Sequence, residues 1–295
     1  MNVYLDSIGC RLNQSEIERL GANFRKAGHQ LVGSAEDADL IVINTCAVTQ
    51  KAEADSRQLV RRVGQGDNAQ VIVTGCWATM APNEVTSLGS VISVVNNVDK
   101  DNIPLRWADH ADRPLPVGQA RSPIPGYRFR TRAFIKCQDG CNRSCTYFVT
   151  RIARGKSRSQ SIETVIRDIQ SAVDGGVKEV VLTGVQLGAW GKDLPGHKGI
   201  SHLVHTILRY TDISRIRLSS IEPWDLSESF FSLFIEPRVC RHLHMPLQSG
   251  SPEILRRMAR KGSLDEYERY MSLARGAEPD IAITTDIIVG FPGET

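Results

Sequence analysis

Two cysteines in the middle of the chain have the spacing of an iron–sulfur loop. Cys141 and Cys145 match the first part of a C-x3-C-x2-C motif. That motif holds a 4Fe–4S cluster through three irons and leaves the fourth iron open for a substrate or cofactor. Cysteine thiolates are the usual protein ligands of such clusters, but the third position is Phe148, whose phenyl ring cannot bind iron. The loop therefore indicates iron–sulfur chemistry with one ligand missing.

Three explanations are open for Phe148. One base separates a cysteine codon from a phenylalanine codon, so a lesion or a sequencing error is the first. A genuine loss of the chemistry is the second, and replacement of the missing ligand by Cys137 is the third. Cys137 precedes Cys141 at the end of an expected strand, whereas the missing ligand follows Cys145 within the loop. A small, packed strand residue is therefore the preferred interpretation of Cys137.

Three further cysteines each follow an apolar segment that is typical of a buried strand. In open α/β sheets, the loops at the carboxyl ends of the strands meet in one crevice. Thiols on three such loops are expected to converge on a shared metal site; the alternative is three unrelated buried thiols. The strand patterns lie at residues 3–6, 40–44 and 70–74, and the cysteines are Cys10, Cys46 and Cys76.

These strand patterns alternate with helical patterns at residues 15–27 and 53–63. A β-α-β alternation predicts a parallel sheet that is covered by helices on both faces. We therefore expect an open parallel-sheet α/β domain over residues 1–107. A proline-rich segment without apolar periodicity follows at residues 108–126, and its composition predicts a linker.

A second alternation of strands and helices fills residues 127–295. In barrel-like parallel sheets, function sits on the loops that follow the strands. Because the sequence stops in a strand-end loop, we expect an incomplete (β/α)6-type partial barrel and a truncated or incomplete sequence. Strands are expected at residues 133–137, 179–183, 215–219, 242–245 and 281–289, and helices at 161–173, 202–210, 226–234 and 252–274.

The composition is that of an ordinary globular protein. Of 295 residues, 41% are hydrophobic and 23% are charged, and no apolar run approaches the roughly 18 residues of a membrane span. The first residues lack the basic and apolar regions of a signal peptide. Seven cysteines in such a chain favour metal or redox chemistry over disulfides. We therefore expect a cytoplasmic protein that makes no contact with a membrane.

A strongly basic segment surrounds the cysteine loop. Residues 121–160 contain ten lysines and arginines against one acid, Asp139. This excess suits a polyanionic partner such as RNA, whereas a solvated basic surface is the alternative. The basic residues are Arg121, Arg128, Arg130, Arg132, Lys136, Arg143, Arg151, Arg154, Lys156 and Arg158; for Arg154 and Arg158 we expect either phosphate or solvent contact.

The chain resembles the radical S-adenosylmethionine methylthiotransferases, in particular the bacterial type that acts on threonylcarbamoyladenosine in tRNA. The resemblance runs through essentially the whole sequence in order. The segments that carry it are Gly9-Cys10-Arg11-Leu12-Asn13-Gln14, Asn44-Thr45-Cys46-Ala47-Val48-Thr49, Thr74-Gly75-Cys76, Gln138-Asp139-Gly140-Cys141-Asn142, and residues 182–188, 219–223, 244–251 and 286–295.

The resemblance implies an enzyme that adds a methylthio group to C2 of N6-threonylcarbamoyladenosine next to the anticodon of tRNA. It implies two 4Fe–4S clusters and S-adenosylmethionine, which carry the hard chemistry while the protein orients and shields them. The implied partners are tRNA and an electron donor such as a flavodoxin or a ferredoxin. By this resemblance, the expected second domain is an incomplete radical S-adenosylmethionine barrel. A catalytically impaired remnant with a single cluster, which binds RNA, is the alternative; a structural zinc site ranks last.

The resemblance also assigns individual residues. Cys10, Cys46 and Cys76 match the ligands of the sulfur-donating cluster, and Cys141 and Cys145 match two ligands of the radical-generating cluster. Five residues at strand ends are expected to bind S-adenosylmethionine; the alternatives are a simple turn for the first two and a capping or ion-pairing carboxylate for the acid. They are Gly184, Val185, Ser220, Glu222 and Gln248.

Overall fold

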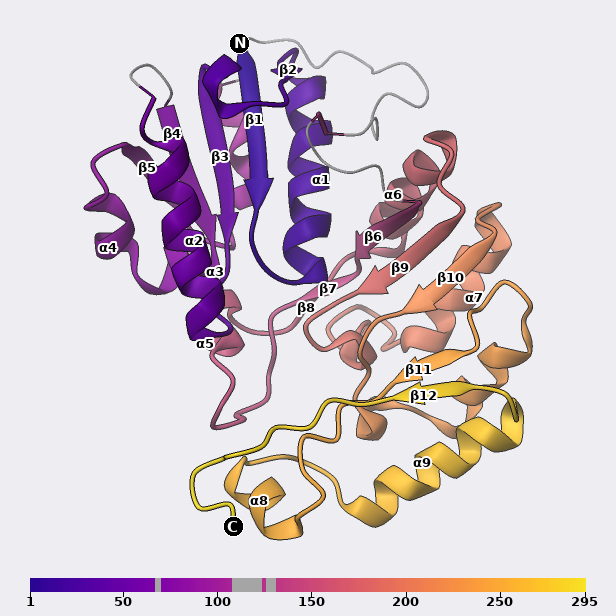
Figure 1. The fold of residues 1–295 in the computed structure, drawn as a ribbon. Helices are drawn as coiled ribbons and strands as arrows, with labels where there is room; N and C mark the ends of the chain where they lie inside the picture. Colours follow the sequence, from indigo (N-terminus) through magenta and orange to yellow (C-terminus); the bar gives the residue numbers. More distant parts are fainter. Residues whose placement is uncertain (67–69, 108–123, 126–130) are drawn as a thin grey trace. The chain divides into compact units, whose positions relative to one another are not determined.

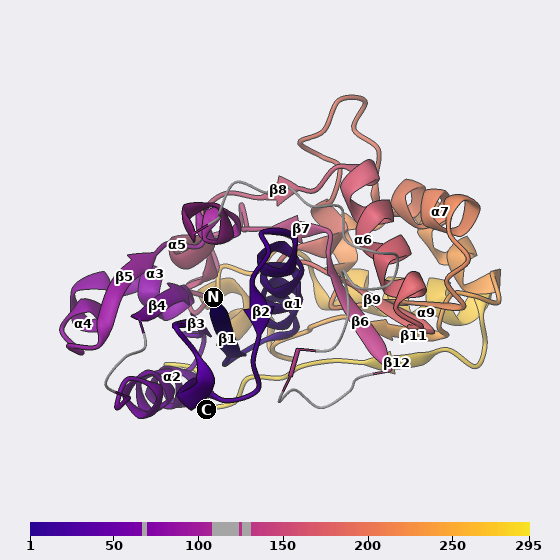
Figure 2. The ribbon, with the colours of Figure 1, turned by 90° about the horizontal axis from the view of Figure 1, so that it is seen from above.

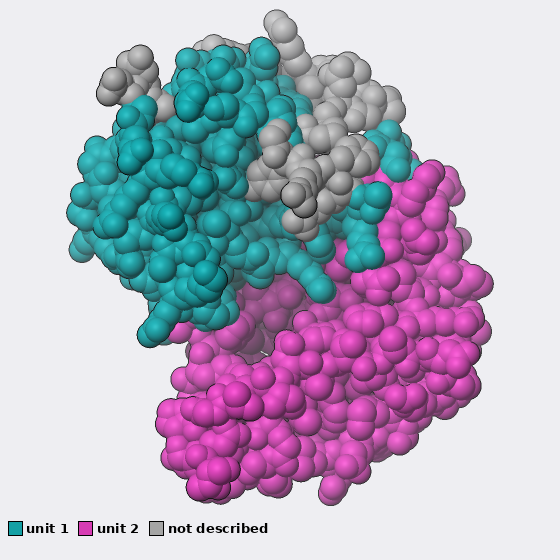
Figure 3. Space-filling view, viewed as in Figure 1, with its two compact units in different colours: residues 1–134, 152–154, 171–176 teal, residues 135–151, 155–170, 177–295 magenta. Residues whose placement is uncertain are grey.

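The computed structural model describes residues 1–66, 70–107, 124–125 and 131–295. The described chain forms two compact units, coloured separately in Figure 3. The first unit contains residues 1–134, 152–154 and 171–176, and the second contains residues 135–151, 155–170 and 177–295. Apart from residues 124 and 125, the expected linker at 108–126 lies outside the described residues. No helix of the described part is long and apolar enough to cross a membrane.

The first unit is built on a five-stranded sheet in the order β2-β1-β3-β4-β5. Every pairing in this sheet is parallel, as the β-α-β alternation predicts. The central strand β3 is buried along its whole length, as expected for a parallel strand covered on both faces. The strands are β1 (Asn2–Ser7), β2 (Gln30–Leu31), β3 (Leu40–Thr45), β4 (Gln70–Gly75) and β5 (Val91–Val95).

Helices α1 (Arg11–Lys26) and α2 (Gln50–Val63) lie on opposite faces of this sheet (Figures 1 and 2). Side chains alternate between the two faces of a strand, so neighbouring residues of β3 enter different cores. Leu40 and Val42 pack with Leu20 of α1, whereas Ile41 and Ile43 pack on the side of α2. Short helices α3 (Cys76–Met80) and α4 (Pro82–Thr86) follow β4.

The remaining strands form three small sheets. The first has the order β10-β9-β6, and β11 pairs with β12 in a second, parallel sheet. Strands β7 and β8 form an antiparallel pair. The bounds are β6 (Arg132–Lys136), β7 (Gln138–Asp139), β8 (Arg158–Ser159), β9 (Glu179–Thr183), β10 (Arg215–Leu218), β11 (His242–His244) and β12 (Ala282–Thr284).

Helices alternate with these strands along the chain (Figure 1). This arrangement confirms the expected α/β class with a partial barrel. The helices are α5 (Thr150–Arg154), α6 (Ile162–Asp174), α7 (Ile200–Tyr210), α8 (Pro252–Arg257) and α9 (Leu264–Ala277), together with several 3-10 turns.

Two details differ from the sequence-based expectation. The five expected strands form two separate ladders, because β10 and β11 share no continuous pairing; an isolated bridge joins Ile216 of β10 to Val239 instead. The helix expected at 226–234 is a 3-10 helix over Glu228–Ile235. There Phe230 packs edge to face on Phe231 and Phe234, with ring centroids 5.5 and 5.7 Å apart. Aromatic packing therefore shapes this segment more than helical periodicity does.

Candidate functional site

The structure brings the loops of Cys10, Cys46 and Cys76 to one edge of the first sheet; we call these residues the thiol site. Strands β1, β3 and β4 are neighbours, and their ends are in register because Ser7 pairs with Asn44 and Thr45 pairs with Gly75. Cys46 and Cys76 directly follow β3 and β4, and Cys10 occupies the N-cap position of α1. All three cysteines lie in the first unit.

Buried polar side chains join the three loops. The Asn13 amide donates hydrogen bonds to the carbonyl oxygens of Ile8 (2.8 Å) and Thr45 (3.0 Å). The Thr45 hydroxyl donates to the Thr74 carbonyl (2.6 Å) and accepts from the Ala78 amide (3.3 Å). Asn13 and Thr45 are at most 1% exposed, and buried polar groups that are fully bonded specify one arrangement. The loops are therefore held in a fixed relation to one another.

Two glycines permit the close approach of these loops. Gly9 has φ +121°, and a Cβ there would lie 2.7 Å from the Cβ of Cys46 and 2.9 Å from its sulfur. Gly75 has φ +102°, and a Cβ would lie 2.2 Å from the Thr45 carbonyl oxygen. Only glycine adopts such backbone angles readily while leaving this space. The glycines beside Cys10 and Cys76 thus allow both residues to approach the loop of Cys46.

The thiols also influence one another electrostatically. Burial raises the pKa of the Cys46 thiol, and the neighbouring thiols of Cys10 and Cys76 raise it further. The positive charge of Arg154 acts in the opposite direction. Three thiolates that approach each other in a buried place repel unless a cation compensates them. The thiol site is thus suited to a positively charged metal centre.

The donor set of the thiol site fits an iron–sulfur cluster. Among the described residues, no three His, Cys, Asp or Glu side chains are arranged to hold a single metal ion. In a cluster each thiolate binds a different iron, so its cysteines lie farther apart than the ligands of one ion. Three cysteine sulfurs match the soft ligands of iron–sulfur clusters. Cys10 is exposed while Cys46 and Cys76 are buried, so one side of the site is open to solvent.

The second cysteine loop lies in the second unit, after β7. Cys141 is buried, and its thiol donates a hydrogen bond to Oε1 of Gln186 (3.5 Å) and accepts one from the Arg143 amide (3.3 Å). Burial raises the pKa of the Cys141 thiol. Gln186 in turn donates to the buried carboxylate of Asp225 (2.9 Å), which also pairs with Arg143 (3.2 Å). Cys141 therefore sits in an ordered polar network.

The residues of this second loop do not fit a cluster held by three thiolates. Phe148 is 38% exposed, and its ring centroid lies 6.3 Å from that of Tyr147. Its amide donates to the Cys145 carbonyl (3.3 Å), so Phe148 belongs to the same short turn as Cys145. Cys137 offers no replacement: it is fully buried, its thiol donates to the Ile135 carbonyl (3.5 Å), and burial raises its pKa. Cys137 is thus a packed residue, as preferred above, and it lies between β6 and β7.

The glycine loop after β9 is closely packed. A Cβ on Gly184 would lie 2.9 Å from Oε1 of Gln138, and the same oxygen accepts a hydrogen bond from the Gln186 amide (2.8 Å). Gly184 and Val185 are both half-buried. The glycine thus allows the Gln138 side chain to approach the backbone. Binding of the cofactor by Gly184 and Val185 stays a prediction.

The other expected cofactor residues occupy two different settings. Glu222 forms a bidentate ion pair with Arg260 (2.9 and 2.6 Å), the ion-pairing alternative raised above. Burial raises the pKa of Glu222, and the charge of Arg260 opposes this. Ser220 is exposed. Gln248 has φ +76°, and its backbone bonds to Asp286 (2.8 Å) and Ile288 (2.8 Å). Their contact with a cofactor also stays a prediction.

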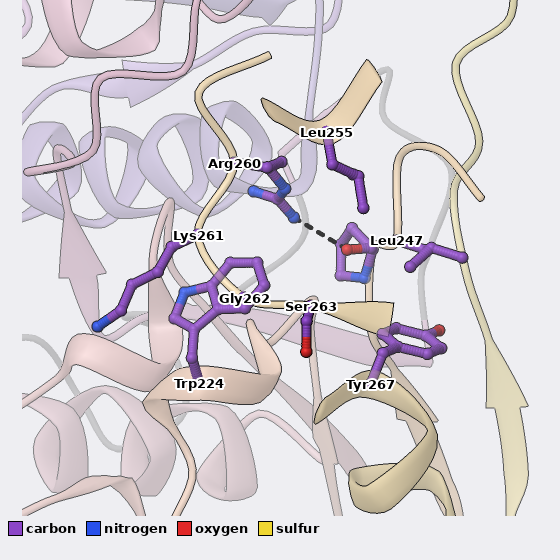
Figure 4. Close-up of a pocket in the computed structure, with 9 residues that line it drawn as sticks. Trp224, Leu247, Leu255, Arg260, Lys261, Gly262, Ser263 and Tyr267 are labelled. Atoms are coloured by element: carbon purple, nitrogen blue, oxygen red, sulfur yellow. Dashed lines mark hydrogen bonds between the residues drawn. The ribbon is translucent and has the colours of Figure 1, made fainter. Parts of the chain in front are cut away.

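A small pocket lies beside this ion pair in the second unit (Figure 4). The Arg260 guanidinium lies 4.9 Å from the centroid of the Trp224 ring and donates to the Pro246 carbonyl (2.9 Å). Tyr267 and Leu255 line the same pocket. Arg260 is thus fixed by a carboxylate, a carbonyl and an aromatic face, which is the favoured surrounding of a partly buried guanidinium.

The basic segment is less available to RNA than its composition indicates. Arg154 is 2% exposed and pairs with Glu16, so the expectation of phosphate or solvent contact was wrong for this residue. Lys136 is 5% exposed and pairs with Asp139 (3.1 Å). Arg158 is half-buried and lies 4.0 Å from the same carboxylate. Three further members of the segment lie outside the described residues, namely Arg121, Arg128 and Arg130.

Comparisons with known proteins agree with these features. The family model described as "Radical SAM superfamily" matches residues 135–295, and the model "Uncharacterized protein family UPF0004" matches residues 2–96. The threonylcarbamoyladenosine tRNA methylthiotransferase MtaB of Bacillus subtilis is 34% identical over 99% of this chain and 68% of its own length. The MtaB protein of Thermotoga maritima is 36% identical over 99% of this chain and 69% of its own.

Two further relatives extend the comparison. A tRNA-2-methylthio-N(6)-dimethylallyladenosine synthase of Lawsonia intracellularis is 32% identical over 100% of this chain and 70% of its own. Among solved structures, the radical S-adenosylmethionine methyltransferase TsrM of Kitasatospora setae, with cobalamin and a [4Fe-4S] cluster bound, superposes with a TM-score of 0.68. The superposition covers 100% of this chain and 70% of TsrM at 15% sequence identity. At this identity the likeness supports the fold alone.

The chain is thus a radical S-adenosylmethionine superfamily protein by fold and by sequence. Within that superfamily it belongs to the MtaB-type tRNA methylthiotransferase family, which confirms the resemblance stated above. Members of the superfamily use S-adenosylmethionine and 4Fe–4S clusters. Phe148 is the point at which this chain departs from the cysteine motif.

Proposed function

We propose that this chain serves the modification of tRNA, by addition of a methylthio group to C2 of N6-threonylcarbamoyladenosine next to the anticodon. The observation that carries the proposal is the thiol site, where three cysteines of neighbouring parallel strands gather at one sheet edge. The identities of 34% and 36% to MtaB proteins over 99% of the chain support the same substrate.

In this proposal, Cys10, Cys46 and Cys76 hold a 4Fe–4S cluster, which supplies sulfur chemistry when it is bound. Asn13 and Thr45 keep the three loops in place through their buried hydrogen bonds. The openness at Cys10 leaves one side of the site accessible. Because only three protein thiolates are present, one iron is left for an exchangeable ligand.

The second cysteine loop favours a second candidate function. Cys141 and Cys145 lack a third thiolate because Phe148 follows them. The proposed chemistry therefore involves no cluster at this loop. The second candidate is a single-cluster protein of the same family, which keeps the thiol site and RNA binding but does not generate a radical. The S-adenosylmethionine contacts of Gly184, Val185, Ser220, Glu222 and Gln248 belong to the first candidate.

The two candidates are separated by the nucleosides of tRNA. The chain is expressed in bacteria that lack their own enzyme of this type, and tRNA hydrolysates are examined by mass spectrometry. Methylthiolated threonylcarbamoyladenosine from the native chain supports the first candidate. If Phe148→Cys forms this nucleoside and the native chain does not, the second candidate is supported, because the native chain then lacked only the third cluster ligand. Absence of the product from both, with both proteins folded and loaded with iron, would reject the proposed substrate.

The proposal includes the partners and the compartment that such chemistry requires. A cluster-based reaction consumes electrons, so a small electron-transfer protein such as a flavodoxin or a ferredoxin is the proposed donor. With tRNA as the substrate, the proposed compartment is the cytoplasm. The proposed division into a domain over residues 1–107 and a radical S-adenosylmethionine core over residues 127–295 leaves the segment at 108–126 as the connection.

A further inference from the structure

A buried charged cluster lies directly behind the thiol site in the first unit. Its centre is Glu16 of α1, whose side chain is 0% exposed. Nζ of Lys100 lies 2.6 Å from one Glu16 oxygen, and the Arg154 guanidinium lies 2.8 Å from the other. Asn44 adds a hydrogen bond to the same carboxylate (3.2 Å). Charges are rarely buried this completely, and a buried pair is weak evidence for stability by itself. We therefore looked for a functional role of the buried cluster in its position behind the thiol site.

Arg154 connects this cluster to the first cysteine loop. Its guanidinium donates a hydrogen bond to Oδ1 of Asn13 (2.6 Å). The thiol of Cys10 lies 3.9 Å from the same oxygen, and the amide nitrogen of Asn13 holds the Ile8 and Thr45 carbonyls. Arg154 thus fixes the side chain that joins the loop of Cys10 to the loop of Cys46.

The residue before Arg154 is connected to the third cysteine loop. The Asn97 amide donates to the Ala153 carbonyl (2.7 Å) and lies 3.7 Å from the sulfur of Cys76. Asn97 is 3% exposed, and its backbone amide bonds to Thr79 just beyond Cys76. Residues 152–154 are counted with the first unit although both their sequence neighbours lie in the second. Two adjacent residues therefore reach the loops of all three thiols.

The electrostatics point in the same direction as the geometry. Arg154 carries a buried positive charge that bonds to Asn13, the residue whose Oδ1 lies 3.9 Å from the Cys10 sulfur. Three thiolates bring three negative charges to a site in which Cys46 and Cys76 are buried. A guanidinium keeps its charge at any relevant pH and is weakly hydrated, so it is the cation best suited to burial. A fixed positive charge beside a cluster stabilises its more negative, reduced form, because net charge and nearby charges set the potential.

We propose that Arg154 is a positioning residue of the thiol site. Its side chain holds the loops of Cys10 and Cys46 through Asn13, the preceding carbonyl of Ala153 holds the loop of Cys76 through Asn97, and its charge sets the reduction potential of the cluster bound there. This inference rests on the proposed function, because it requires a cluster on Cys10, Cys46 and Cys76. Arg154 does not touch the reacting atoms. Its action is exerted through the loops and through its charge.

The test uses the full chain with Cys141→Ser and Cys145→Ser, so that only the thiol site can bind iron. Arg154→Gln removes the charge and retains an amide donor, and Arg154→Lys retains the charge and loses the planar fork. Iron and sulfide are measured after anaerobic reconstitution, and the midpoint potential is measured by titration followed with electron paramagnetic resonance. Circular dichroism establishes that each variant is folded.

Arg154→Gln is expected to lower the ratio of reduced to oxidised cluster about tenfold at a given potential, a negative shift of about 59 mV for one electron. Arg154→Lys is expected to retain most of the potential while losing iron faster to a chelator. An unchanged potential in Arg154→Gln, or an equal shift in both variants, would overturn the inference. If Arg154→Gln does not fold, Asn97→Leu provides the second test: faster iron loss is expected, and unchanged iron retention would overturn the positioning role.

The parent protein separates this inference from the proposed function. If the chain with intact Arg154 and the two serine substitutions binds no iron, the proposed cluster site itself fails. If that protein binds iron normally and the Arg154 variants match it in content and potential, only the role of Arg154 fails.

Discussion

Phe148→Cys is the substitution that most directly examines the second cysteine loop. It restores the third thiolate in the turn where the Phe148 amide already bonds to the Cys145 carbonyl (3.3 Å). With Cys141 and Cys145, it completes the C-x3-C-x2-C spacing. The iron content after anaerobic reconstitution is expected to rise from about four to about eight per chain, the content of two 4Fe–4S clusters.

The cost of removing the ring is small. Phe148 is 38% exposed, and full burial of a phenylalanine side chain contributes roughly 1.5–3 kcal/mol. The loss on shortening this side chain is therefore about 1–2 kcal/mol at most. Phe148→Ser is the matched control, because serine has the size of cysteine and removes the same ring without adding a thiol. Any instability from the missing ring is expected in both variants, whereas additional iron is expected only in Phe148→Cys.

The assays are iron and sulfide determination, followed by measurement of 5′-deoxyadenosine after reduction in the presence of S-adenosylmethionine. We expect cleavage by Phe148→Cys above the level of Phe148→Ser. The reasoning about the missing ligand would be refuted by equal iron content and equal cleavage in the two folded variants.

Three further outcomes follow from the packing around the cysteines and from the buried charges. Gly75→Ala places a Cβ 2.2 Å from a carbonyl oxygen beside the thiol site and should abolish its iron binding. Gly89→Ala also has a positive φ but meets nothing within 4 Å, so it should bind iron normally in the same assay. In the iron-free protein, alkylation followed by peptide mass spectrometry should label exposed Cys10 early and Cys137 only after denaturation, since burial raises the Cys137 pKa and lowers its thiolate fraction; early labelling of Cys137 would contradict the packing. Glu16→Gln leaves buried cations without their carboxylate and should lower the free energy of unfolding by about 3–5 kcal/mol; a change below about 1 kcal/mol in urea titrations would contradict the burial.

Much of the first unit was predictable from local patterns. Runs such as Leu-Ile-Val-Ile-Asn at residues 40–44 are buried on both faces, so hydrophobicity alone identifies β3 and its parallel neighbours. Cys10, Cys46 and Cys76 were placed by the rule that strand ends share an edge, and the register of β1, β3 and β4 agrees with it. Strand β5 (Val91–Val95) was missed, because its short apolar segment has no helix of clear periodicity before it.

The rest depended on contacts that sequence patterns do not reveal. Arg154 lies in a basic segment, so charge composition predicts exposure, yet its partner Glu16 is 138 residues away in the sequence. Lys100 and Asn97 gave no signal of any kind, because a single lysine or asparagine after a strand is usually on the surface. Local patterns likewise do not reveal the interruption between β10 and β11. Ligand roles for the individual site residues stay predictions.

The most direct test of the account is the iron content of the thiol site. The full chain with Cys141→Ser and Cys145→Ser is reconstituted anaerobically with iron and sulfide, with and without the additional substitution Cys46→Ser. We predict about four irons per chain in the first protein and a loss of nearly all of them in the second. Retention of the iron after Cys46→Ser, or its absence from both folded proteins, would contradict the claim that Cys10, Cys46 and Cys76 hold one cluster.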